Sequence, residues 1–220
     1  MAMKTRERIM LAARRMFNDK GYGNVTTAAL AEEVGISEGN LWYHFNNKRA
    51  LLVALSEEFL GSIAERLAIR PQDESKIIEE YIAFLGEYAQ ELRDFRFLYR
   101  DQADYGEHSD TILEQLPQLY WKTHEQLLSF YTAMVRNGQL DWPEDRLPDL
   151  AVNAKIIVRY GLEYMRETGQ PVEEGSGAVQ QAFAQHLTLF EHKLSLEASK
   201  KLRDALSVSA KPQLETETSS

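Results

Sequence analysis

The sequence has 220 residues, of which 44% are hydrophobic, 10% aromatic and 27% charged, and this ordinary globular composition excludes a low-complexity or fibrous chain. A formal net charge of −9 argues against a general nucleic-acid binder when the chain is taken whole. Residues 1–56 nevertheless carry a net charge of +3, which leaves −12 on the rest and predicts that any contact with a polyanion lies at the N-terminal end.

Apolar residues recur at helical spacing along the chain and no segment sustains a two-residue alternation, which predicts an all-α fold of about nine helices. The predicted helices lie near 5–20, 27–34, 38–44, 48–69, 73–88, 94–104, 110–136, 145–168 and 178–206. Pro117 marks either the start of a helix or a kink. We expect a first domain at 1–47, a larger helical domain at 48–208, and a disordered tail at 209–220.

The stretch 27–45 contains two short helices that meet at a tight turn. Gly35 lies at this turn, where a left-handed backbone is cheap only for glycine. The apolar residues that would hold the two helices together are Leu30, Val34, Ile36 and Leu41. This is the spacing of a helix-turn-helix, in which the second helix enters the major groove of DNA. An ordinary helical hairpin would share the spacing, but it would not need the three large amphipathic residues at 42–44.

A dense set of residues resembles the N-terminal signature of the TetR family of bacterial regulators. The matching residues are Gly21-Tyr22, Thr26-Thr27, Leu30-Ala31, Val34-Gly35-Ile36-Ser37, Gly39, Leu41-Trp42-Tyr43-His44-Phe45, Lys48 and Leu51-Leu52. The resemblance covers about residues 5–55, and the rest of the chain is similar to the family only in its length and its division into helices. It implies a helix-turn-helix domain followed by a helical bundle that binds a ligand and dimerises.

The same resemblance implies which residues contact DNA. The set is Thr26, Thr27, Ser37, Glu38, Gly39, Asn40, Trp42, Tyr43, His44 and Lys48. The threonines and Ser37 would cap helices and bind phosphates, and Gly39 would let the backbone approach the DNA closely. Asn40 would read base edges, while Tyr43, His44 and Lys48 would contact phosphates. Glu38 would either accept from cytosine or complement the helix N-terminus, and Trp42 stands where many members have tyrosine.

Residues 81–131 contain eleven aromatic side chains, about twice the average density of the chain. They form either a large aromatic core or the lining of a cavity for an apolar or aromatic ligand. For the cavity, the candidate lining residues are Tyr81, Phe84, Tyr88, Phe97, Tyr99, Tyr105, Tyr120, Trp121, His124 and Tyr131.

The two long C-terminal helices each carry apolar stripes. A helix with two such stripes packs against two things, its own domain and a second copy of the chain. In TetR-like proteins the corresponding helices form a four-helix dimer interface, and a palindromic operator requires a two-fold dimer. The candidate interface residues are Ile156, Tyr160, Tyr164, Val179, Phe183, His186 and Phe190, and purely intramolecular packing is the alternative.

Chemistry of other kinds finds no support in the sequence. The chain has no cysteine, no glycine-rich phosphate loop, no zinc-binding His-Glu motif and no nucleophile elbow, so we expect no enzyme, no cofactor and no metal. Its longest apolar run has six residues, too short for a membrane span or an export signal, and the cytoplasm is the predicted location.

The sequence therefore predicts a homodimeric repressor that leaves a palindromic operator when a small apolar or aromatic ligand binds. The alternative is a DNA-binding adaptor of the same fold that acts through a protein partner and has no small-molecule effector. An all-α enzyme with a degenerate DNA-binding head is the remaining hypothesis.

Overall fold

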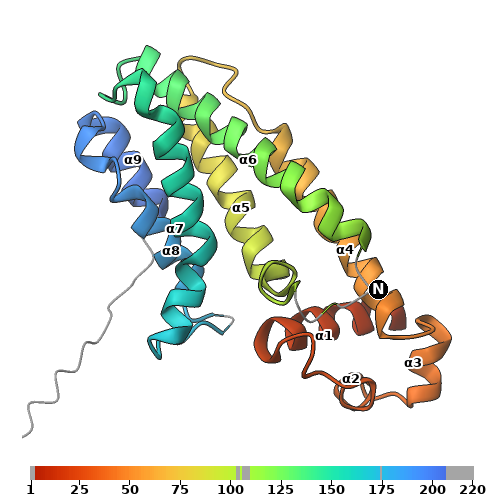
Figure 1. The fold of residues 1–220 in the computed structure, drawn as a ribbon. Helices are drawn as coiled ribbons and strands as arrows, with labels where there is room; N and C mark the ends of the chain where they lie inside the picture. Colours follow the sequence, from red (N-terminus) through yellow and green to blue (C-terminus); the bar gives the residue numbers. More distant parts are fainter. Residues whose placement is uncertain (1–2, 103–104, 106–109, 174, 207–220) are drawn as a thin grey trace, which may run out of the picture. The chain divides into compact units, whose positions relative to one another are not determined.

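The computed structural model describes residues 3–102, 105, 110–173 and 175–206, with backbone alone for 110–113 (Figure 1). Within these residues there are nine α-helices and a single isolated bridge between extended residues, Leu140 and Leu194. This confirms the predicted all-α class. The chain divides into two compact units, Met1–Phe130 and Tyr131–Ser220. The predicted domain boundary after residue 47 lies inside the first unit, and the predicted tail at 209–220 lies outside the described residues.

The first three helices are α1 (Thr5–Lys20), α2 (Thr27–Val34) and α3 (Glu38–His44), as the sequence predicts. Local signals account for their ends. The Thr26 hydroxyl accepts from the N–H of Ala29 at 3.2 Å, and the Ser37 hydroxyl accepts from that of Asn40 at 3.2 Å, so each caps the following helix. Gly35 has a φ of 72° and closes α2 in the left-handed conformation.

Three longer helices follow: α4 (Lys48–Ala68), α5 (Ile77–Arg100) and α6 (Asp110–Arg136). Helices α4 and α5 belong to the first unit, and α6 crosses the boundary at residue 130. The predicted start of a helix at Asp73 is wrong, because the Asp73 carboxylate accepts from both the N–H and the hydroxyl of Ser75 in a local turn. The segments predicted near 73–88 and 94–104 are one helix, α5, with non-helical backbone angles at Phe95. Helix α6 continues through Pro117.

The second unit contains α7 (Leu147–Glu167), α8 (Ala178–Leu187) and α9 (Leu196–Leu206), with the short 3₁₀ helices η2 (Glu144–Arg146) and η3 (Glu191–Lys193). The single helix predicted at 178–206 is therefore wrong. Leu194 is extended and pairs with Leu140, while the Ser195 N–H donates to the Gln139 carbonyl at 2.9 Å. This backbone pairing between distant segments outweighs the helical periodicity of the stretch.

Helices α7 and α8 pack closely on each other. A Cβ atom added to Gly161 of α7 would lie 3.1 Å from the Cβ of Ala182 on α8, tighter than an ordinary contact. Two small residues thus let the helix backbones approach, and Ala182 and Phe183 are completely or almost completely buried.

Candidate nucleic-acid interface

Helix α3 turns one face inward and presents the other to solvent. Leu41 is only 1% exposed, whereas Tyr43 two residues later is 83% exposed. The remaining predicted contact residues of this segment divide into exposed ones, Ser37, Glu38, Gly39 and Asn40, and half-buried ones, Trp42 and His44. The exposed face carries an amide, a hydroxyl and a phenol, the kinds of group that hydrogen-bond to base edges and phosphates.

Gly39 is unusual because nothing inside the protein requires a glycine there. Its φ is not positive, and the nearest atom to an added Cβ would be the Ser37 Oγ, at 3.9 Å. A glycine within a helix costs about 1 kcal/mol relative to alanine. Gly39 therefore has open space around it in the folded chain, and a close approach of DNA at this position stays a prediction.

Glu38 has a partner within the helix-turn-helix. The Thr27 hydroxyl donates to the Glu38 Oε1 at 3.3 Å, and Glu38 lies in the first turn of α3. This placement favours the interpretation in which its carboxylate complements the helix N-terminus. Thr26 is exposed and Thr27 is half-buried, so both lie at the surface beside α3.

Lys48, at the start of α4, points at the loop that follows α1. Its ammonium donates to the Tyr22 carbonyl and lies 4.1 Å from the centre of the Tyr22 ring. Asn47 caps the same helix end by accepting from the Ala50 N–H at 2.8 Å. In this structure Lys48 therefore joins α4 to the loop between α1 and α2, and a phosphate contact would have to be shared with or replace that bond.

Several basic residues of α1 are also engaged within the protein. Arg8 donates to the carbonyl of Val34, and Arg15 forms an ion pair with Glu33. Both contacts tie α1 to the end of α2. The positive charge of residues 1–56 thus has a structural use beside any electrostatic attraction to DNA.

The predicted effector-binding residues belong to both units of the chain. Tyr81, Phe84, Tyr88 and His124 are buried in the first unit, as is Tyr99, whose ring stacks on Tyr120 with the centres 6.2 Å apart. The other four predicted residues have different surroundings. Phe97 and Tyr105 pack against the α1 region through Phe17 and Tyr22, Trp121 is 61% exposed, and Tyr131 lies in the second unit beside Phe190. That these residues line one ligand cavity stays a prediction.

A buried polar network among the aromatic rings was missed by the sequence analysis. The Arg66 Nε donates to the Glu91 Oε2 at 2.8 Å, with both side chains 1% exposed or less. The same guanidinium donates to Gln126 and Thr123 of α6, each at 3.1 Å, and Tyr99 donates to Glu91. In the sequence, Arg66 and Glu91 fall on the apolar stripes of α4 and α5. A charged residue on an apolar stripe was the signal that could have predicted a buried ion pair.

Electrostatics within this network favours the charged pair. Burial is the largest single effect and works against the charged form of Arg66, but the attraction of Glu91, Tyr99 and Tyr88 and the hydrogen bond to Glu91 together outweigh it and raise the pKa of the guanidinium. Burial, followed by the nearby Glu91 carboxylate, raises the pKa of Tyr99 well above its ordinary value, so the phenol stays protonated and donates. Gln126 also donates to the carbonyls of Arg66 and Ile69, both at 2.7 Å, which fixes the end of α4.

The predicted dimer residues fall into two groups. On α7, Ile156 is 50% exposed, Tyr160 58% and Tyr164 65%, and Val152 extends this exposed apolar stripe. On and after α8, the other four are buried within the single chain: Val179, Phe183, His186 and Phe190. These four fill the core of their own chain, and their contact with a partner stays a prediction.

A cleft of about 180 Å³ lies in the second unit and shares no residue with the predicted effector lining. Its walls include Trp142, Arg146, Asp149 and Leu189. Among the described residues, no helix is long and apolar enough to span a membrane, and no group of three potential metal ligands is found.

Two family models match consecutive segments of the chain. A family model described as bacterial regulatory proteins, tetR family, matches residues 9–55, and one described as TetR, bacterial transcriptional repressor, matches residues 59–202. The regulator YerO of Bacillus subtilis is 26% identical over 75% of the chain and 57% of its own length. The class C tetracycline repressor of Escherichia coli is 36% identical over 44% of the chain and 42% of its own length.

The chain thus spans about half the length of these curated relatives. A solved TetR-family regulator from Marinobacter aquaeolei VT8 is similar over 93% of the chain and 98% of its own, with a TM-score of 0.73 and 24% identity. This likeness concerns the fold.

Proposed function

The chain belongs to the TetR family of bacterial transcriptional regulators, and we propose that it is a homodimeric, sequence-specific DNA-binding repressor. Its operator is a palindrome, and a small apolar or aromatic ligand releases it. The bound partners are thus double-stranded DNA, a second copy of the chain and one effector.

The exposed face of α3 is the observation that carries the proposal. Asn40 and Tyr43 stand in solvent on a helix whose opposite face is anchored by Leu41. Gly39, directly before Asn40, has open space where a Cβ would lie. A surface with hydrogen-bonding side chains and a glycine reserved for close approach fits a duplex, in which phosphates position the protein and base edges select the sequence.

The exposed stripe of α7 supports the dimer. Val152, Ile156, Tyr160 and Tyr164 recur at a spacing of four residues and are all at least 41% exposed. A run of large apolar side chains left in solvent on one helix face is typical of an interaction surface. A two-fold dimer formed through this stripe has two copies of α3, one for each half-site of a palindrome.

The buried aromatic set of the first unit supports an effector that is largely apolar. Tyr81, Phe84 and Tyr88 line α5, next to the Arg66–Glu91 pair that fixes the end of α4. Helix α4 begins at Lys48, which contacts Tyr22 in the loop that leads from α1 to α2. A ligand that separates these rings would shift α4 and change the spacing of the two α3 helices. By linkage, operator DNA would weaken the ligand by the same factor.

The DNA-binding part is tested by fluorescence anisotropy with duplexes from the region upstream of the chain's own gene. We expect one duplex to bind with an affinity that falls steeply as salt is raised, because several phosphates are neutralised per half-site. Asn40→Ala should reduce the preference for that duplex over a scrambled one by about five-fold or more, since one base contact contributes about 1–3 kcal/mol. Asn137→Ala, an exposed asparagine of the second unit, is the matched control. A salt-independent signal, or unchanged discrimination in Asn40→Ala, contradicts the assignment.

The effector part is tested separately by thermal shift against a panel of aromatic compounds. A ligand-released repressor gains stability from its effector and loses operator affinity in its presence. A chain that binds its operator while no compound changes either quantity would instead favour the adaptor that acts through a protein partner.

A further inference from the structure

Helix α5 is interrupted at Phe95, whose φ of −130° and ψ of 25° are not helical. In a regular helix the N–H of Phe97 donates to the carbonyl of Arg93, four residues earlier. Here the N–H of Phe97 donates to the Oδ1 of Asn18, with an N···O distance of 3.0 Å. Because Phe97 is completely buried, its N–H needs such a partner, and the interruption persists only with a replacement for the helical bond.

Asn18 belongs to α1, and its amide replaces both halves of the missing bond. While Oδ1 accepts from Phe97, Nδ2 donates to the carbonyls of Arg93 and Asp94, each at 3.0 Å. The side chain is 8% exposed. One amide of α1 is thus inserted into the hydrogen-bond ladder of α5, in the gap where that helix is broken. Helix α1 belongs to the proposed DNA-binding domain, residues 1–47, called the head below.

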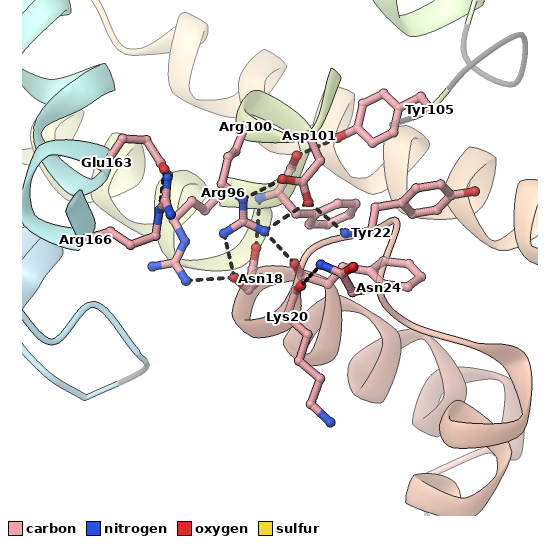
Figure 2. Close-up of polar contacts among 12 residues, drawn as sticks. Asn18, Lys20, Tyr22, Asn24, Arg96, Arg100, Asp101, Tyr105, Glu163 and Arg166 are labelled. Carbon is pink, nitrogen blue, oxygen red and sulfur yellow. Dashed lines mark hydrogen bonds and ion pairs between the residues drawn. The ribbon is translucent and has the colours of Figure 1, made fainter. Parts of the chain in front are cut away.

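The same end of α1 is held by two arginines of α5, as Figure 2 shows. Arg96 and Arg100 donate to the Asn18 carbonyl at 2.8 and 2.9 Å, and Arg100 also donates to the Phe17 carbonyl at 2.9 Å. Cations at a helix C-terminus are favourable because that end carries partial negative charge. Asp101 pairs with Arg100 and accepts from the N–H of Tyr22 at 2.8 Å.

We propose that Asn18 is the positioning residue that couples the helix-turn-helix to α5, and this inference rests on the proposed DNA binding. The chain has two arrangements in which the Phe97 N–H is satisfied. In one, the amide is inserted, α5 is broken at Phe95 and the head is seated. In the other, the amide is withdrawn, Phe97 bonds to Arg93 and the head is released. A ligand that prefers the continuous helix therefore lowers operator affinity without touching α1.

The test measures head position and DNA binding in the same full-length variants. Because the chain has no cysteine, Asn46→Cys on the head and Glu87→Cys on α5 provide two unique, exposed sites for spin labels. Double electron–electron resonance on labelled chain diluted with an excess of unlabelled chain gives the distance between them within one copy. Operator affinity is measured by anisotropy at a temperature where every variant is folded.

We expect Asn18→Ala to change the narrow distribution of distances between the two spin labels into a broad or double one. Operator binding should weaken about ten-fold, which corresponds to about a tenth of the molecules remaining competent to bind. Asn24→Ala is the matched control, because the Asn24 amide donates to the Lys20 carbonyl of α1 and has no bond to α5. Its distance and affinity should equal those of the parent. If Asn18→Ala does not fold, Arg100→Gln keeps the inserted amide and should shift both readouts in the same direction by less.

The proposal is overturned if Asn18→Ala keeps the narrow distance of the parent and binds the operator within two-fold of the parent's affinity, even if its melting temperature falls. The same criterion applies to Arg100→Gln where that variant replaces Asn18→Ala. A broadened distance in a protein whose parent binds no duplex would instead support the coupling and overturn the proposed DNA binding.

Discussion

The Arg66–Glu91 pair provides a quantitative prediction, because it is completely buried and joins two helices. We consider Arg66→Met and Glu91→Leu, singly and together. Removing one partner leaves the other charge in an apolar interior, which costs about 3–5 kcal/mol for a buried pair. Arg66 also donates to Gln126 and Thr123, so its loss leaves additional polar groups without that donor. Each single variant should therefore lose about 4 kcal/mol of unfolding free energy.

The double variant should lose much less than the sum of the two. No charge is left unpaired in it, and the two apolar side chains pack among Phe84 and Tyr88, which already flank the guanidinium. Glu91 no longer accepts from the Tyr99 hydroxyl, and Gln126 loses one donor, at about 1–3 kcal/mol for a polar group left without a partner. We expect the double variant to lose about 3 kcal/mol in total.

The assay is urea unfolding followed by circular dichroism at one protein concentration, which must be fixed if the chain dimerises. The Arg146–Asp149 pair of the second unit is a matched control, because its N···O distance is also 2.8 Å but its side chains are 64% and 62% exposed. Arg146→Met should change the unfolding free energy by less than about 1 kcal/mol. Single-variant losses below that value at Arg66 and Glu91, or strict additivity in the double variant, would refute the reasoning.

Three further predictions follow from individual residues. Gly39→Ala should raise the unfolding free energy by about 0.5–1 kcal/mol, because alanine is the better helix former, while operator affinity falls; equal or tighter DNA binding would show that no close approach occurs there. Burial lowers the pKa of His186 from 6.5 to about 4, so its neutral form contributes about 3 kcal/mol of stability above pH 6.5, and this contribution is lost as the pH falls towards 4. A His186→Gln variant should lack this part of the pH dependence of the unfolding free energy in urea, and an unchanged pH dependence would remove His186 as its source. Tyr160→Glu should halve the mass measured by light scattering, whereas Tyr43→Glu, on the still more exposed tyrosine of α3, should leave the mass unchanged. A full-size Tyr160→Glu assembly would place the interface elsewhere.

The helix-turn-helix could be predicted almost residue by residue because its signals are local. Thr26 and Ser37 each cap a helix that starts at the next residue, and Gly35 takes the left-handed conformation that ends α2. Each of these interactions joins residues within four positions of one another. The apolar spacing around Leu41 then determines which side of α3 faces solvent, and the exposure of Tyr43 follows from it.

The effector region and the C-terminal helices were harder to predict because periodicity does not identify the partner of an apolar face. The sequence places Phe183 and Phe190 on a stripe, but only packing shows that the stripe is used inside the chain and that α8 ends at Leu187. Phe97 and Tyr105 belong to the aromatic count of 81–131, yet their ring contacts are with the α1 region.

By itself the sequence determined the helical class, the limits of the first three helices and the outward face of α3, since caps, turns and helical periodicity act over a few residues. Tertiary structure alone decided that Arg66 meets Glu91 across 25 residues, and that Asn18 meets the broken ladder of α5 nearly 80 residues away. Such contacts depend on how whole helices pack, because a buried charge or amide is stable only where distant segments supply all of its partners at once.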